Sequence, residues 1–164
     1  CVLLARSGDV LRHLAAQFRE GTIVKQYLCL LDGVMQEARE VVDAPLLKVR
    51  SDQEHSMDVD ADGKAALTHF RLLQAYAGAS YVEAEIFTGR THQIRVHAAH
   101  LGLPLAGDNR YSSADSQKKW KERGLNRLFL HAHHLVFTSL SGKNIECHAP
   151  LPAALGAVLD AIEP

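Results

Sequence analysis

The chain has 164 residues, of which 47% are hydrophobic and 23% are charged, and its formal net charge is −1. These values are typical of one soluble globular domain and exclude a disordered chain, a collagen-like repeat or a coiled coil. No uncharged apolar run is long enough to cross a membrane and no signal peptide is visible, so we expect a cytoplasmic protein with no membrane partner.

Hydrophobic spacing predicts helices and strands along the whole chain. In chain order we expect a strand over 2–6, a helix over 8–20, a buried strand over 23–31, a short edge element over 41–49, an exposed hairpin or loop over 51–63, strands over 66–74 and 81–87, a helix over about 94–101, a charged Ser-rich insertion over 111–124, strands over 127–137 and 144–148, and a closing helix over 151–162. This order predicts the α+β class, with a mixed, mostly antiparallel sheet and flanking helices.

The charged residues and the cysteines add two expectations. Residues 90–127 hold eight Lys and Arg against three Asp and Glu, whereas residues 36–62 hold three against eight. The near-zero net charge therefore conceals one basic and one acidic surface. The three cysteines are an odd number without metal-type spacing, which favours a reducing compartment over a disulfide framework.

A strand end, a glycine turn and a helix start meet in the segment 89–95. Backbone N–H groups at a helix start attract anions, and arginine is suited to contact phosphate with two parallel hydrogen bonds. Arg90 and Arg95 are five residues apart, so they leave the helix at different angles, and one is able to face a phosphate while the other points inward. A helix cap with two solvated arginines is the alternative, and spacing alone does not separate the two.

The histidines suggest a metal site, but their spacing argues against one. Helical zinc ligands normally lie four residues apart, and no such pair occurs here. Histidines that are satisfied in the core or that face RNA fit the pattern better than a zinc-dependent hydrolase, which we keep as a third hypothesis. The histidines concerned are His92, His97 and His100 on the predicted helix and His131, His133 and His134 on the predicted strand.

Two aromatic residues admit two interpretations each. Tyr27, at the start of the buried strand, is either a core residue with its hydroxyl at the surface or a platform on which an extruded base stacks. Trp120 stands among Lys118, Lys119, Lys121 and Arg123, which form either a solvated charged loop or a nucleic-acid contact.

Four segments together resemble the RluA/RluC/RluD family of pseudouridine synthases, and among its branches the chain is most similar to RluC. Their order and spacing match across almost the whole chain, and the run Gly-Arg-Thr-His-Gln-Ile-Arg-Val-His is highly specific to that family. The matching segments are 25–33, 89–97, 104–111 and 127–132.

The resemblance implies isomerisation of uridine to pseudouridine in large-subunit ribosomal RNA, by a monomer without metal or organic cofactor. It implies that Tyr27 packs on the flipped base and serves the C5 proton, and that Arg95 keeps the catalytic aspartate ionised. Leu130 would close the base pocket. The RNA side would hold Arg90, His92 and Gln93.

The chain departs from the family pattern at its start. The family aspartate lies in a His-Arg-Leu-Asp-x-x-Thr-Ser-Gly segment just before the strand that here begins at Cys1, and Asp9, Asp32 and Asp43 do not fit that motif. We therefore expect residues 1–164 to be a catalytic domain truncated at its N-terminal side, without the S4-like RNA-binding domain. A non-catalytic RNA-binding module of the same fold is the alternative.

Overall fold

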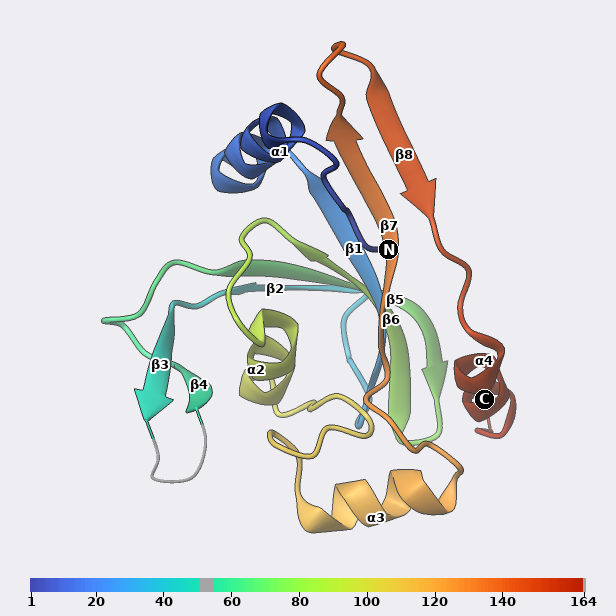
Figure 1. Ribbon diagram of the computed structural model, residues 1–164. Helices are drawn as coiled ribbons and strands as arrows, with labels where there is room; N and C mark the ends of the chain where they lie inside the picture. The colour runs from blue at the N-terminus through green and yellow to red at the C-terminus, as the bar shows by residue number, and fades with distance from the viewer. Residues whose placement is uncertain (51–54, 164) are drawn as a thin grey trace.

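The computed structural model describes residues 1–50 and 55–163 (Figure 1). Within these ranges the helices and strands are α1 (Gly8–Glu20), β1 (Val24–Leu31), β2 (Arg39–Asp43), β3 (Leu46–Arg50), β4 (His55–Val59), β5 (Leu67–Tyr76), β6 (Ala79–Ile86), α2 (Gln93–His100), α3 (Ala114–Glu122), β7 (Leu130–Thr138), β8 (Asn144–His148) and α4 (Ala153–Asp160). None of these helices is both long and apolar enough to cross a membrane.

A six-stranded sheet in the order β2-β5-β6-β1-β7-β8 forms the centre of the molecule, and β3 and β4 make a separate two-stranded sheet at its side (Figure 1). Every pairing among the described strands is antiparallel. The predicted α+β class with a mostly antiparallel sheet is thus confirmed. The tip of the expected hairpin over 51–63 lies partly outside the described residues.

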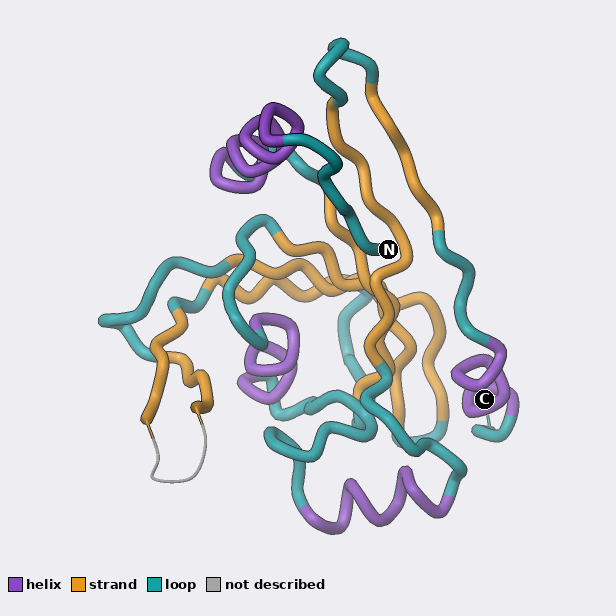
Figure 2. Tube along the Cα trace, in the orientation of Figure 1, coloured by secondary structure: helices purple, strands orange, loops and turns teal. Residues whose placement is uncertain are grey.

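The second half of β1, from Leu28 to Leu31, is buried on both faces, because α2 covers one side of the sheet and α3 and α4 cover the other (Figure 2). Cys29 and Leu31 pack in one core together with residues of α2, whereas Leu30 packs in a second core with residues of α3 and α4. Successive side chains of a strand point to opposite faces, so a strand between two cores needs apolar residues at consecutive positions. This explains the nearly unbroken apolar run at the end of β1.

Helix α1 begins and ends at the predicted residues. The hydroxyl of Ser7 accepts a hydrogen bond from the amide of Val10, and Gly21 ends the helix with a φ of 71°. Gln17 then fixes the helix to β7: its amide nitrogen donates to the carbonyl of Thr138, and its amide oxygen accepts from the Thr138 N–H, both at 2.8 Å. The side chain of Gln17 thus pairs with backbone as a neighbouring strand would.

The predictions for residues 2–6 and for residues 41–49 differ from the structure. Residues 2–6 form no strand, and Val2 is 85% exposed; the Cys1 amino group donates to the Ala132 carbonyl at an edge of β7, but no regular ladder follows. The expected single element over 41–49 is two strands, because proline at position 45 lacks the N–H that would continue the ladder. The first of these strands, β2, does lie at the edge of the six-stranded sheet.

The expected charged insertion over 111–124 contains helix α3. The hydroxyl of Ser113 accepts from the Ser116 N–H and caps its start. Ser116 and Trp120, four residues apart, form its buried face, and Trp120 is 0% exposed. Trp120 is therefore a core residue, and its indole is not available to stack on a base.

Candidate active site

Gln93, at the start of α2, joins the preceding loop to the sheet. Its side-chain oxygen accepts from the hydroxyl of Thr88 and from the N–H of Arg90, and its nitrogen donates to the carbonyl of Leu67 and the hydroxyl of Thr68. The residue is 3% exposed. Its amide is fully occupied inside the protein, which differs from the predicted contact with RNA; in this position Gln93 fixes the loop that carries Arg90.

His92 adopts a left-handed backbone conformation with a φ of 55°, and it is the only residue other than glycine with a positive φ in the described part of the chain. Such a conformation costs about 1–3 kcal/mol in a residue with a side chain and is concentrated at functional sites. Nδ1 of His92 lies 2.9 Å from the hydroxyl of Tyr111. Burial, helped by the nearby charges of Arg95 and Arg110, lowers the pKa of His92, which favours the neutral ring.

Arg95 forms an ion pair with Asp108 through two parallel hydrogen bonds. Nε donates to Oδ2 at 2.8 Å and Nη2 donates to Oδ1 at 2.7 Å. Asp108 is 0% exposed, and its Oδ1 also accepts from the backbone amides of Arg110 and Tyr111. The Tyr111 ring lies 5.0 Å from the Arg95 guanidinium carbon. Asp108 and Tyr111 therefore hold Arg95 in one orientation, while its Nη1 group has no acceptor among the described residues.

Gly107 allows the loop that carries Asp108 to approach the segment before β7. Its φ is 73°, and a Cβ atom there would lie 2.3 Å from the carbonyl oxygen of Arg127. Only glycine combines a positive φ with such a close backbone approach at low cost. The close approach places the Asp108 carboxylate beside α2.

Tyr27 lies near the start of β1, between Ala84 of β6 and Ala132 of β7. Its half-buried ring packs against the core on the α2 side of the sheet. Burial raises the pKa of the Tyr27 phenol above its usual value, with a smaller effect from Cys29. No described residue forms a hydrogen bond with its hydroxyl, so a neutral phenol is available to a ligand.

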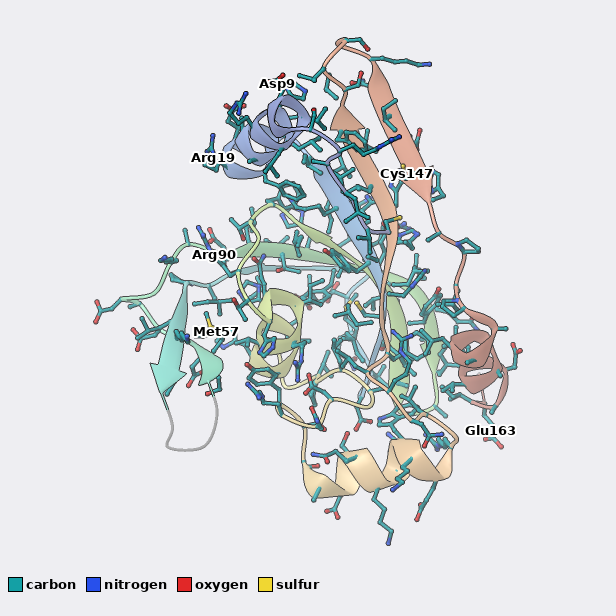
Figure 3. All side chains as sticks on the ribbon, in the orientation of Figure 1. Asp9, Arg19, Met57, Arg90, Cys147 and Glu163 are labelled. Atoms are coloured by element: carbon teal, nitrogen blue, oxygen red, sulfur yellow. The ribbon has the colours of Figure 1, made fainter. Side chains whose placement is uncertain are left out.

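Tyr27, His92, Gln93 and Arg95 line one cavity of about 330 Å³. Its walls combine apolar side chains with two arginines, and no Asp or Glu is among the lining residues. Figure 3 shows Arg90, which lines this cavity, beside the loop that leads into α2 and above the β3–β4 sheet. All six site residues predicted from the sequence are brought together here. The lining residues are Tyr27, Ile86, Arg90, His92, Gln93, Ile94, Arg95, Leu128 and Leu130.

A family model described as RNA pseudouridylate synthase matches residues 1–100. The chain belongs to this family. The ribosomal large subunit pseudouridine synthase C of Vibrio cholerae is 43% identical over 159 residues, which cover 96% of this chain and 50% of that protein. An uncharacterized RNA pseudouridine synthase of Zymomonas mobilis is 42% identical over 156 residues, which cover 94% of this chain and 68% of that protein.

Solved structures of pseudouridylate synthase domains have the same fold. Human RNA pseudouridylate synthase domain containing 1 superimposes with a TM-score of 0.81 at 28% identity, over 98% of this chain and 67% of that chain. Human RNA pseudouridylate synthase domain containing 4 superimposes with a TM-score of 0.76 at 23% identity, over 96% of this chain and 70% of that chain. The present chain spans about half the length of the Vibrio and Haemophilus relatives it matches.

The histidines of this chain point in different directions. His97 is buried, His100 is exposed, and His131 and His133 bond respectively to the Ala149 carbonyl and Glu83. Among the described residues only one group of potential metal ligands converges, and it contains a single member of the predicted set. This group consists of His134, Glu146 and His148, whose side chains are joined to each other by hydrogen bonds. The predicted histidine set thus gives the zinc-hydrolase hypothesis no geometric basis.

The basic residues around Trp120 are divided between two roles. Lys118 and Lys119 pair with Glu122 and Asp32, respectively. Lys121 instead lines a second, polar cavity of about 560 Å³ that shares Arg95 and Leu128 with the first. An RNA contact by Lys121 stays a prediction.

His97 connects α2 to the sheet through a chain of hydrogen bonds that the sequence did not reveal. Its Nε2 lies 2.9 Å from the carbonyl of Ala44, so Nε2 carries the proton, since a carbonyl only accepts. Its Nδ1 then accepts from the hydroxyl of Thr68 at 2.8 Å, and that hydroxyl in turn accepts from Gln93. Burial lowers the pKa of His97, which keeps the ring neutral.

We expect the stability of the folded protein to fall in mild acid because of His97. The folded state resists protonation of His97, so the unfolded state binds more protons once the pH drops below about 6.5. The loss has a slope of at most about 1.4 kcal/mol per pH unit for each such group, and His92 and His133, whose pKa values burial also lowers, add to it. Urea denaturation at a series of pH values measures the slope.

His97→Gln should make this pH dependence shallower, because glutamine does not titrate. His100→Gln is the matched control, since His100 lies on the same helix but is exposed. Equal slopes for His97→Gln and the wild type would show that another group causes the acid sensitivity.

Proposed function

We propose that the natural protein containing this chain is a pseudouridine synthase that converts uridines of large-subunit ribosomal RNA to pseudouridine. The observation that carries the proposal is the cavity: six positions that match the family motifs, from β1, the loop before α2, α2 and β7, line one space. The curated relatives named as ribosomal large subunit pseudouridine synthase C support the choice of RNA.

The cavity suits a flipped uracil. The apolar walls formed by Ile86, Leu128 and Leu130 accept a base that has left its stack, and the Tyr27 ring packs on it. Flipping costs a few kcal/mol, which burial of the base against these walls offsets. Arg90, which is exposed at the rim, is available to contact a backbone phosphate.

The reaction also needs a carboxylate, and we propose that it enters from residues ahead of Cys1. The backbone nitrogen of Cys1 donates to the carbonyl of Ala132, two residues along β7 from Leu130 in the cavity wall. A preceding segment would therefore run close to the cavity. There the unpaired Nη1 of Arg95 would stabilise its aspartate in the ionised form, because an opposite charge nearby lowers a carboxyl pKa.

The residues divide the isomerisation between them. The aspartate starts cleavage of the bond between ribose C1′ and uracil N1, either by attack at the ribose or by removal of the 2′ proton. The freed uracil rotates, and its C5 bonds to C1′ as the ester to the aspartate breaks or, on the second route, as a proton returns to C2′. N1 then gains a proton and the C5 proton leaves. In this proposal the neutral Tyr27 hydroxyl relays that proton, accepting it at the oxygen while giving up its own. His92 and Gln93 position the loop that carries Arg90.

We also propose that the protein acts as a monomer in the cytoplasm, where ribosomal RNA is accessible. Size-exclusion chromatography with light scattering tests the oligomeric state, and a stable dimer would contradict this part of the proposal.

Pseudouridine formation by the complete natural protein tests the function directly. We expect unmodified large-subunit ribosomal RNA to gain pseudouridine at defined positions, detected by carbodiimide labelling and primer extension. Arg95→Lys should lower the rate by about 10²-fold or more, because lysine keeps the charge but cannot bond to two partners in the fixed geometry of a guanidinium. Arg71→Lys is the matched control, since Arg71 pairs with Glu83 outside the cavity.

Binding of RNA without any turnover by the wild-type protein would overturn the enzymatic proposal and favour the non-catalytic RNA-binding module. Wild-type rates for Arg95→Lys would leave the activity standing but remove the role of Arg95.

A further inference from the structure

A third cavity, distinct from the polar cavity that Lys121 lines, adjoins the proposed uridine pocket. It measures about 350 Å³ and shares Arg90 with the first, so one guanidinium borders both spaces. Figure 3 shows Arg19 at the end of α1 and Arg90 below it, on the same side of the molecule. The lining residues are Phe18, Arg19, Phe87, Thr88, Gly89 and Arg90.

Two phenylalanine rings in this cavity are unusually open to solvent. Phe18 is 48% exposed and Phe87 is 39% exposed. The end of α1 brings them together, because Gly21 lies directly against the backbone carbonyl of Phe87.

Each ring is also supported by a second side chain. The Lys25 amine lies 5.9 Å from the centre of the Phe18 ring, and the His69 ring lies 4.5 Å from that of Phe87. Fixed aromatic rings with open surface are the usual platform for an unstacked base.

The charged groups of the cavity are both cationic. Arg19 has no ion-pair or hydrogen-bond partner among the described residues, and Arg90 uses only Nε, which donates to the Ala65 carbonyl at 3.0 Å. No acidic side chain lines the cavity. Two free guanidinium ends beside two aromatic rings match the phosphate and base of a single-stranded nucleotide.

We propose that this cavity binds the nucleotide next to the target uridine, with its base against Phe18 and Phe87 and its phosphate between Arg19 and Arg90. The inference rests on the proposed function, because a neighbouring nucleotide exists only if a uridine occupies the first cavity. Flipping the uridine removes a stacking partner from its neighbour. The phenylalanine rings replace that partner, and the enzyme thereby favours target uridines in loops, where the neighbour is free to turn out of its stack.

RNA binding by variants of the complete natural protein tests the proposal. With an RNA stem-loop that carries the target uridine, Phe18→Ala and Phe87→Ala should each raise the Kd by about 10-fold or more, the effect expected from loss of one base–aromatic stack. Phe18→Tyr keeps a ring and should bind as the wild type does. Leu11→Ala is the matched control, because Leu11 is an exposed apolar residue of the same helix outside the cavity.

Removal of the neighbouring base separates stacking from a structural effect. In two further stem-loops the nucleotide on the 5′ or the 3′ side of the uridine is made abasic. For one of these two RNAs the Kd of the wild-type protein should rise by about the same 10-fold. Phe18→Ala should then raise the Kd for that RNA no further. The proposed subsite is wrong if Phe18→Ala weakens the binding of both abasic RNAs as much as that of the intact RNA. It is also wrong if Phe18→Ala weakens the binding of none of the three RNAs. Pseudouridine formation by the wild type on the intact RNA, measured in parallel, reports separately on the proposed function.

Discussion

Asp108→Asn is expected to lower the free energy of unfolding by about 3–5 kcal/mol, the usual cost of removing one partner from a buried ion pair. Asparagine has the shape of aspartate, and its one oxygen can still accept from the amides of Arg110 and Tyr111. Its NH₂ group then faces Nε of Arg95, donor against donor, where Oδ2 now accepts at 2.8 Å. Nε of Arg95 would lose its acceptor, and the guanidinium would keep only the bond from Nη2 to the remaining oxygen, opposite a group that no longer carries a negative charge.

Urea denaturation of the wild type and of Asp108→Asn measures this loss. Glu122→Gln is the matched control: it removes the carboxylate of an exposed ion pair with Lys118 on α3 and should change stability by no more than about 0.5 kcal/mol. A similar small effect of Asp108→Asn would mean that the Arg95–Asp108 pair contributes little to the fold.

The Arg95–Asp108 pair also predicts how the difference in stability between the wild type and Asp108→Asn depends on pH. Burial alone would raise the pKa of Asp108, but the hydrogen bonds from Arg95 and from two backbone amides outweigh burial and hold this pKa below its usual range. The stabilisation is therefore complete above the ordinary aspartate pKa of about 3.9 and is lost as the pH falls through the lower folded-state value. The stability gap between the wild type and Asp108→Asn should thus persist at pH 5 and narrow only below about pH 4.

Local sequence signals were sufficient for most of the fold. Hydrophobic spacing predicted α1 over 8–20 and alternating residues predicted β6, because the faces of helices and strands depend on neighbours within a few positions. Residues 2–6 also have a strand-like composition, but a strand needs a partner, which composition does not report. Helix α3 was missed for the opposite reason: its charged surface outweighed the weak signal of Ser116 and Trp120 on one face.

The residues that line the candidate site were predicted from motifs. The residues that hold them in place were not. Tyr27, Arg95 and Leu130 were matched by the resemblance and do line one cavity. The partner of Arg95 in this chain is Asp108, thirteen residues away, and spacing does not predict a contact between a helix and a later loop. One sequence feature does point to the burial of Asp108: Gly107 stands directly before it. A glycine at a sharp turn permits a close backbone approach, which here buries the neighbouring residue.

The burial of Gln93 shows the limit of assigning roles from a motif alone. A polar residue in a run of RNA-binding residues is easily assigned to the RNA, and exposure decides whether it is available. Gln93 is buried and bonds to four groups of the protein, whereas Arg90, three positions earlier, is exposed. One motif thus contains both an exposed residue that is available to a ligand and a buried residue that holds the loop in place.

Tyr27→Phe is expected to lower the rate of pseudouridine formation by about 10²–10⁴-fold, the range typical of losing one proton-transfer group, while RNA affinity stays close to that of the wild type. Phenylalanine keeps the ring that packs on the base and removes only the hydroxyl, which has no hydrogen-bond partner among the described residues. Removing it therefore leaves no protein group unsatisfied, and folding should be retained. The measurement is single-turnover kinetics with the complete natural protein at saturating RNA, together with the Kd.

Tyr81→Phe is the matched control for this prediction. Tyr81 lies on β6, is also half-buried, and packs edge-on against Phe129 with ring centres 6.2 Å apart, but it does not line the cavity. Its loss of a hydroxyl should leave the rate unchanged. A wild-type rate for Tyr27→Phe, combined with a slow Tyr27→Leu variant, would show that the ring acts as a packing surface and that the C5 proton leaves by another route. Because burial raises the pKa of Tyr27, the wild-type rate should also show no loss from ionisation of this phenol below about pH 10.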